Sequence, residues 1–201
     1  MALLLTWAGA AEPTAPGLRT GGTPLVPAGF TWPTCATCSG AQQFLAQLPL
    51  DASDRDGATV LAFQCANDPG LCDEWDPASG GNAALVVDGP LSPAEVPDAG
   101  VTTLPAVSAL SLVEVPGGYD DARQAHDEAH GPRTVVGQLG GEPAWVQGDE
   151  TPECPGCGAP TTFVAQLEEG HDPDARANFG GGCAYVFACR GCATGRFLWQ
   201  C

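Results

Sequence analysis

The stretch PTCATCSGAQQFLAQL, at residues 33–48, returns 119 residues later as PECPGCGAPTTFVAQL, at residues 152–167. Aligned without gaps, residues 21–48 and 140–167 are identical at eleven of 28 positions. Composition alone predicts about two or three identities. The identical pairs are Gly21/Gly140, Gly22/Gly141, Pro24/Pro143, Gly29/Gly148, Pro33/Pro152, Cys35/Cys154, Cys38/Cys157, Phe44/Phe163, Ala46/Ala165, Gln47/Gln166 and Leu48/Leu167. This similarity indicates an internal duplication.

The duplication continues into a second pair of predicted strands. VLAFQC, at 60–65, corresponds to AYVFAC, at 184–189, with an offset of 124 because the intervening loop is longer in the second repeat. In these segments both alternating faces carry apolar side chains, which predicts strands inside a covered sheet. The same pattern predicts strands at 84–89, 133–139 and 196–201.

Composition and repeats together predict the fold class. The chain has 27 Gly, 19 Pro and only 15% charged residues, which favours turns and short strands over long helices. We expect a mainly β (α+β) protein made of two pseudo-symmetric β-rich repeats with one short helix between them. The first repeat spans 1–90 and the second 133–201. They are joined by a Pro/Ala-rich connector at 91–132, and we expect one compact domain.

The connector and the N-terminus carry further expectations. In the connector, VTTL (101–104) and SLVEV (111–115) indicate some edge strand. YDDARQAHDEAHG (119–131) predicts a helix, with acidic residues in its first turn and glycine at its end. The opening MALLLTWAGA lacks the positive residues and apolar length of a secretory signal, so we expect a buried strand there. No run approaches the length of a membrane helix, and we expect a soluble, cytoplasmic protein.

The ten cysteines follow a spacing typical of zinc sites. Cys154-Pro-Gly-Cys157-Gly has the form of a zinc knuckle, a tight turn that directs backbone amides at the sulfurs. A second C-x-x-C pair lies downstream, and two such pairs predict a four-cysteine tetrahedral site. The first repeat offers a similar set, although six residues separate its last two cysteines. The predicted ligands of two structural zinc ions are Cys35, Cys38, Cys65 and Cys72 in one site and Cys154, Cys157, Cys189 and Cys192 in the other.

Alternatives for the cysteines remain open at this stage. Cys183 enters a predicted strand as a small buried residue, and Cys201 could replace Cys192 as a ligand. Disulfides are a second possibility. A redox C-x-x-C motif is a weaker one, because that motif normally opens a helix, whereas here it precedes a strand.

Two motifs suggest a catalytic metal site and a phosphate-binding loop, but each departs from the known pattern. His126 and His130 are four residues apart on the predicted helix and could bind a metal with an acidic third ligand, as in a metal-dependent hydrolase. However, Asp127 stands where the zincin motif requires glutamate, and favourable histidines at a helix C-terminus explain the pattern. NFGGGC (178–183) precedes a strand, and without a following helix it is a poor phosphate cradle. Four-thiolate zinc has no open coordination position, so we predict no enzymatic activity.

The charge of the chain restricts its partners. It has 24 acidic residues, seven arginines and no lysine, for a formal net charge of −17. Two zinc ions bound by four thiolates each would take this to about −21. Such a surface repels nucleic acid phosphates and fits a basic protein partner. The alternative is that the acidity only keeps the protein soluble. The carboxylates form three clusters: Asp51, Asp54 and Asp56; Asp68, Asp73, Glu74 and Asp76; and Glu168, Glu169, Asp172 and Asp174.

The repeated blocks also resemble a known family. TGGTPLVPAGFTWPTCATCSGAQQFLAQL resembles the opening block of the bacterial YwqG-like proteins, with GG-x-P, W-P and F-L-A-Q in that order. LGGEPAWVQGDETPECPGCGAPTTFVAQL resembles their second block, with its G-x-P-x-W-V-Q-G-D. The GG-x-P-x-W, the paired cysteines and the F-hydrophobic-x-Q of this sequence also resemble the eukaryotic programmed cell death protein two (TYPP) family. The resemblance covers about residues 20–75 and 133–201 and implies a duplicated β-rich fold with a binding role. It suggests a chaperone or adaptor for a basic protein such as a ribosomal protein, or alternatively an immunity protein against a toxin.

Overall fold

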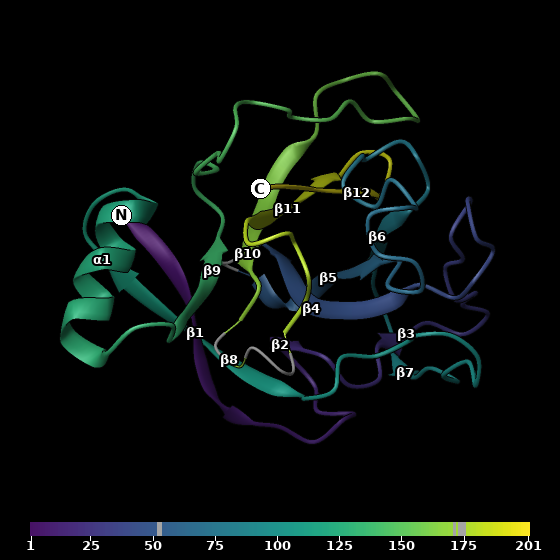
Figure 1. The fold of residues 1–201 in the computed structure, drawn as a ribbon, viewed down its shortest axis with the longest axis horizontal. Helices are drawn as coiled ribbons and strands as arrows, with labels where there is room; N and C mark the ends of the chain where they lie inside the picture. The colour runs from purple at the N-terminus through teal and green to yellow at the C-terminus, as the bar shows by residue number, and fades with distance from the viewer. Residues whose placement is uncertain (52–53, 171, 173–175) are drawn as a thin grey trace.

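The computed structural model describes residues 1–51, 54–170, 172 and 176–201 (Figure 1). It contains twelve strands and one helix within these ranges. The strands are β1 (Ala2–Ala10), β2 (Arg19–Thr20), β3 (Leu25–Val26), β4 (Gln43–Asp51), β5 (Asp54–Gln64), β6 (Asn82–Val87), β7 (Ser92–Pro93), β8 (Ser108–Val115), β9 (Val135–Leu139), β10 (Thr162–Glu168), β11 (Cys183–Cys189) and β12 (Thr194–Gln200), and the helix is α1 (Tyr119–His130).

Ten of the strands form a closed antiparallel barrel. Their order around it is β1-β8-β2-β4-β5-β6-β12-β11-β10-β9, and β3 pairs with β7 in a separate two-stranded sheet. Strands β4, β5 and β6 lie beside β10, β11 and β12 in the barrel, which brings the two repeats together at β6 and β12 (Figure 1). The predicted mainly β class with one short helix is confirmed.

The duplication is visible in the strand register. Phe44 pairs with Phe63 in β4 and β5, and Phe163 pairs with Phe187 at the equivalent place in β10 and β11. Both hairpins contain an irregularity immediately after this pair, at the residue before the repeated alanine. The two repeats therefore share their pairing and their bulge as well as their sequence.

The repeated glutamine of the F-x-A-Q-L motif has a structural role. Gln47 Oε1 accepts a hydrogen bond from Leu25 N at 3.2 Å, and Gln166 Oε1 accepts one from Ala144 N at 3.0 Å. Both donors lie shortly after the repeated Gly-Gly pair, Leu25 in β3 and Ala144 in a loop. Each buried glutamine thus holds the segment after the Gly-Gly pair against its barrel strand.

The N-terminal strand pairs with the second repeat, and the strand of the connector pairs with the first repeat. The N-terminal β1 pairs with β9 of the second repeat, through Leu4 and Gln138, while β8 pairs with β2 of the first repeat, through Ala109 and Arg19. The strands β1 and β8 also pair with each other. The buried N-terminal strand is confirmed, but β8 has a partner on both sides and is not an edge strand. Residues 101–104 form no strand and contribute a single bridge, from Thr103 to Phe44.

Apolar side chains are buried on both faces of the central strands. Inside the barrel, Leu45 and Leu48 of β4 contact residues from both repeats, including Val164 and Val186. Outside it, each repeat has its own aromatic cluster. The two clusters are centred on Phe44 and Phe63 with Trp32, and on Phe163 and Phe187 with Trp145. This arrangement confirms the expectation of strands in a covered sheet.

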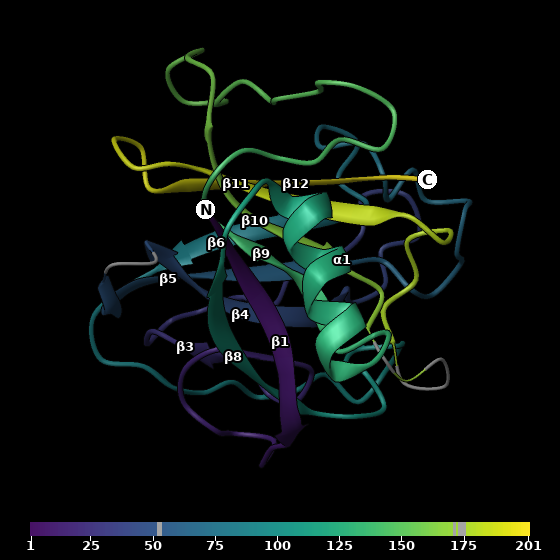
Figure 2. The same cartoon turned by 90° about the vertical axis from the view of Figure 1, so that its left-hand side faces the viewer.

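The helix α1 covers one side of the barrel next to β1 and β9 (Figure 2). Its buried residues Tyr119 and Ala122 pack against Leu4 and Val135. Asp120 and Asp121 lie in its first turn, and it ends before Gly131, whose φ of 94° a residue with a side chain rarely adopts. The predicted helix is confirmed. No helix in the described ranges has both the length and the apolar character needed to cross a membrane.

Arg19 of β2 is a buried cation bonded to backbone oxygens. Its guanidinium donates to the carbonyls of Ala15 (2.7 Å), Gly21 and Thr23, and its side chain is 1% exposed. Burial lowers the pKa of Arg19 to about 10, so it stays charged at neutral pH. It stacks over the Phe44 ring at 5.4 Å. Arg19 thereby ties the loop with the Gly-Gly pair to the first aromatic cluster.

We expect Arg19→Met to lower the free energy of unfolding by about 3–5 kcal/mol. The substitution keeps much of the side-chain volume but leaves three carbonyls without their donor, each at a cost of about 1–3 kcal/mol. Chemical denaturation measures this change. Arg190→Met is the control, because the Arg190–Asp51 pair is largely exposed and such pairs contribute about 0–1 kcal/mol. Equal stabilities of the two variants would contradict the assignment.

Candidate metal centres

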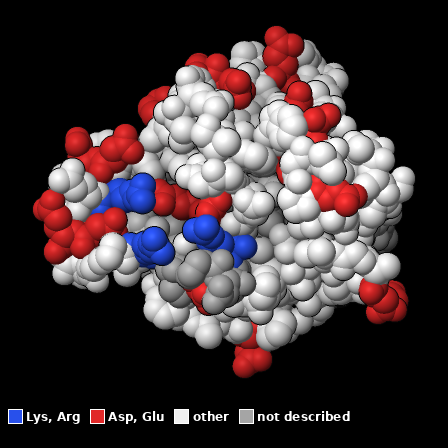
Figure 3. All heavy atoms as spheres, viewed as in Figure 1, with Lys and Arg blue, Asp and Glu red and all other residues white. Residues whose placement is uncertain are grey.

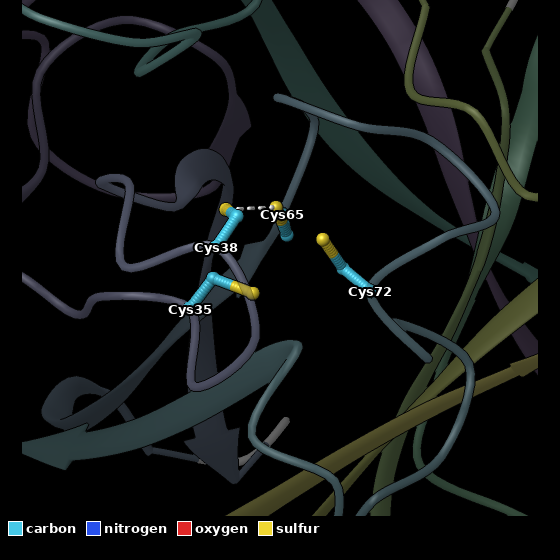
Figure 4. A group of neighbouring side chains, drawn as sticks. All are labelled: Cys35, Cys38, Cys65 and Cys72. Carbon is cyan, nitrogen blue, oxygen red and sulfur yellow. Dashed lines mark hydrogen bonds between the residues drawn. The ribbon is translucent and has the colours of Figure 1, made fainter.

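The first four-cysteine group is assembled by the two ends of the β4–β5 hairpin and the loop that follows it. Cys35 and Cys38 belong to the knuckle before β4, Cys65 follows β5, and Cys72 lies in the next loop. The four side chains point toward one another (Figure 4). Their sulfurs all lie within 4.8 Å of one another.

The second group repeats this construction. Cys154 and Cys157 precede β10, Cys189 ends β11, and Cys192 lies in the turn to β12. Their sulfurs also lie within 4.8 Å of one another. The structure therefore brings together both predicted sets of ligands. Within the described residues, no other group of three or more His, Cys, Asp and Glu side chains meets this criterion.

The two knuckles have equivalent backbone hydrogen bonds. In the first, Cys35 N donates to Gly40 O (2.9 Å) and Ser39 N to Cys35 O (2.9 Å). In the second, Cys154 N donates to Ala159 O (2.8 Å) and Gly158 N to Cys154 O (2.8 Å). Ser39 and Gly158 both have positive φ, 60° and 70°. The turn thus forms in the first repeat even though serine replaces the glycine that this conformation favours.

The sulfur positions fit a metal ion bound by four thiolates. Tetrahedral metal–sulfur bonds of about 2.3 Å place the sulfurs about 3.8 Å apart. Cys38 and Cys65 sulfurs are separated by 3.6 Å, and Cys157 and Cys189 sulfurs by 3.9 Å. A disulfide requires about 2.05 Å, and all ten cysteines are free thiols. The structure therefore does not show the disulfides of the second alternative. Each C-x-x-C motif precedes a strand, whereas a redox C-x-x-C motif normally precedes a helix.

The pKa values of the sulfurs favour a cation at each centre. Burial raises the pKa of Cys154. Hydrogen bonds from the N–H groups of Gly156 and Cys157 and from the neighbouring thiols outweigh this effect and bring the pKa down to about 6. Hydrogen bonding to the other three thiols raises the pKa of Cys192 to about 12. In the first centre burial raises the pKa of Cys72. Without a cation, four adjacent sulfurs therefore cannot all be thiolates, whereas a bound metal ion stabilises all four.

Asn67 supports the first centre and was not singled out from the sequence. Its Nδ2 donates to Ala41 O at 3.0 Å and to the Cys65 sulfur at 3.5 Å, and it lies 3.8 Å from the Cys38 sulfur. It approaches Gly40 so closely that a Cβ there would lie 2.6 Å from Nδ2. The available signal was an amide residue two positions after a ligand, which can donate to sulfur.

The two centres differ in their access to solvent. In the first, Cys35, Cys65 and Cys72 are at most 1% exposed. In the second, Cys154 is buried, but Cys157 and Cys192 are exposed and Cys189 is half-buried. Cys72 of the first centre and the neighbouring Asn67 belong to the 66–81 segment, whereas Cys192 of the second centre lies in a short turn. Water and small solutes therefore reach the second centre more readily.

Cys183 and Cys201 belong to neither four-cysteine group. In the β11–β12 hairpin Cys183 pairs with Gln200, whereas Cys189 pairs with Thr194 at the opposite end. From Thr194 to Gln200 the strand rises about 20 Å. Cys201 is therefore too far from the knuckle to replace Cys192.

The other two motifs do not form a catalytic site in the described residues. The rings of His126 and His130 are 4.4 Å apart, and Thr134 Oγ1 lies 3.3 Å from His126 Nδ1. No third ligand joins them within the part of the chain that the structure describes. The amides of Phe179 and Gly181, in the glycine-rich loop, donate to Glu169 Oε1 at 2.9 and 2.8 Å. The loop therefore binds a carboxylate of the protein itself.

Comparison with known proteins gives limited information. No protein-family model matches the chain. It is similar to "Uncharacterized protein YpfL" of Salmonella typhimurium (strain LT2), with 39% identity over 61 residues. The match covers 30% of this chain and 14% of that protein. The chain thus spans a small part of this relative, which itself has no described activity.

Proposed function

We propose that this protein is a zinc-stabilised, acidic protein-binding module that acts as a chaperone or adaptor for a basic protein. The observation that carries the proposal is the pair of four-thiolate centres. Four sulfurs complete a tetrahedral shell, so a metal held there has no position for water or substrate and serves the fold. Four-cysteine groups in C-x-x-C knuckles are typical of zinc.

The charge of the surface supports the second part of the proposal. A formal net charge of −17 steers cationic partners toward the protein and repels polyanions. Acidic side chains appear at many places in the view of Figure 3, whereas the arginines visible on this face lie close together near α1. The resemblance to the YwqG-like and programmed cell death protein two families supports the same role. A ribosomal protein is a client of suitable charge.

The proposal is tested by finding and measuring the partner. The zinc-loaded protein is used as bait in its native host, and mass spectrometry identifies what it retains. Association and dissociation rates are then measured at 50 and 500 mM NaCl. We expect a basic partner whose association slows with salt while dissociation changes less, because screening acts over about 8 Å at physiological salt. A neutral or acidic partner, or rates that salt does not affect, would contradict the proposal. A toxin as partner would indicate the immunity role.

A further inference from the structure

The segment between the third ligand of the first centre and β6, residues 66–81, has no counterpart of similar length in the second repeat. There, only Arg190–Ala193 separate Cys189 from β12. We call residues 66–81 the long zinc loop. It is held in place at several points: Cys72 belongs to the metal centre, and Asn82 Nδ2 donates to Glu74 O (2.8 Å) and Asp76 O (3.0 Å). Its side chains are therefore presented from a fixed backbone.

This ordered loop exposes large apolar side chains. Leu71 is 76% exposed and Trp75 40% exposed. Val101, 44% exposed, lies beside the loop because its N–H donates to Asn67 Oδ1 at 3.0 Å. Elsewhere in the described residues, the large apolar side chains exposed to this degree are Met1, Trp7 and Val146. Exposed apolar side chains gathered on a rigid segment are typical of a protein interaction site.

The carboxylates of the loop differ from those of the other acidic clusters. Asp51 pairs with Arg190 (2.6 Å) and Glu169 with Arg176 (3.0 Å), while Glu168 contacts Arg123 at 2.9 Å. The side chains of Asp54, Asp56 and Asp174 lie outside the described residues. In these two clusters, several carboxylates therefore form ion pairs with arginines of the same chain.

In the long zinc loop, Asp68, Asp73 and Asp76 are all exposed. Within the described residues no arginine lies within 4.0 Å of their carboxylates. Residues 56–122 contain no lysine or arginine at all. Arg196 approaches the loop, but it donates to the backbone carbonyl of Pro77, at 2.8 Å. The loop therefore combines exposed apolar side chains with carboxylates that form no ion pair with an arginine in the described part of the chain.

We propose that the long zinc loop docks a basic segment of the partner that carries an apolar side chain. Leu71 and Trp75 receive the apolar side chain, and Asp68, Asp73 and Asp76 receive the lysines or arginines around it. A second copy of this chain is a poor occupant, because it would bring the same carboxylates and a net charge of −17 to the surface. The inference rests on the proposed function and assigns that function to one surface.

The test uses peptides of defined charge and the zinc-loaded protein. The probe is a peptide of alternating lysine and leucine; two sister peptides replace leucine by serine or lysine by glutamate. We expect the wild-type protein to bind the lysine–leucine peptide at least tenfold more tightly than either sister. Leu71→Ser should weaken this binding about tenfold, because burial of one leucine is lost. Val146→Ser, which removes an exposed apolar side chain of the second repeat, should change it less than twofold.

A charge-matched pair of triple variants completes the test. Asp68→Asn, Asp73→Asn and Asp76→Asn together should slow association at least fivefold, and asparagine tolerates the positive φ of 48° at position 73. The control, Glu12→Gln, Glu114→Gln and Asp121→Asn, removes the same charge from exposed positions outside the loop and should slow it less than twofold. Zinc content and melting temperature are measured for every variant.

The outcomes distinguish the two proposals. Failure of the wild-type protein to prefer the lysine–leucine peptide would overturn the proposed function and this inference with it. A preference that persists equally in the loop variants and their controls would overturn only the assignment to the long zinc loop. A wild-type dimer that Leu71→Ser dissociates would also overturn it, because the loop would then be covered by a second copy.

Discussion

Cys35→Ser is expected to reduce the zinc content from two ions per chain to one and to lower the melting temperature by about 10 °C or more. Cys35 is 1% exposed, and its sulfur lies with the other three sulfurs of the first centre. A structural zinc site contributes about 10–16 kcal/mol of apparent binding free energy, comparable to the about 5–15 kcal/mol stability of a whole domain. Even a third of this contribution, about 3–5 kcal/mol, would be enough for such a shift.

The duplication supplies a matched variant and a control. Cys154→Ser alters the equivalent residue of the second knuckle and should also leave one zinc ion. Cys201→Ser alters an exposed cysteine outside both centres and should leave two ions and an unchanged melting temperature. Metal analysis of reduced protein and differential scanning calorimetry measure both quantities. Wild-type protein without zinc, or Cys35→Ser with two zinc ions, would show that these cysteines do not form the centres.

The second large effect concerns the rate of metal loss. We expect a chelator to remove the two zinc ions in two phases, with the second centre emptied at least tenfold faster. Cys157 and Cys192 are exposed, whereas Cys35, Cys65 and Cys72 of the first centre are buried. A chelator reaches an exposed ligand directly, but exchange of a buried centre requires local opening of the structure. Zinc release into a coloured indicator measures both phases.

The phases are assigned with one variant and one chemical map. Cys157→Ser should lack the fast phase and keep the slow one. Limited alkylation followed by mass spectrometry should modify Cys157 and Cys192 before Cys35, Cys65 and Cys72. A single phase releasing both ions, or alkylation that begins in the first centre, would contradict this order. Because Cys72 lies in the long zinc loop, the slow phase also reports on how firmly that loop is held.

The metal centres could be predicted from local spacing because their ligands lie on recurring local structures. A C-x-x-C turn brings two sulfurs to one side irrespective of the rest of the fold, and a hairpin returns the chain to the same place. The strands were predictable for a similar reason, since apolar residues on both faces, as in β4 and β11, require cover on both sides. Asn67 was missed because its contacts with Cys38 and Ala41 join segments that are far apart in the sequence.

The sequence by itself therefore determined the mainly β class, the duplication, the helix at Tyr119–His130 and the two four-cysteine sets, because each depends on the order of residues within one segment. Only the tertiary structure decided that β1 pairs with the second repeat and β8 with the first, which closes the barrel. The apolar pattern of a strand does not determine which strand it pairs with. The tertiary structure also decided that the first centre is more buried than the second, and that Cys201 belongs to neither centre. It likewise decided which carboxylates pair with arginines. Asp51 and Arg190, for example, are 139 residues apart in the sequence and meet only when the two repeats pack together.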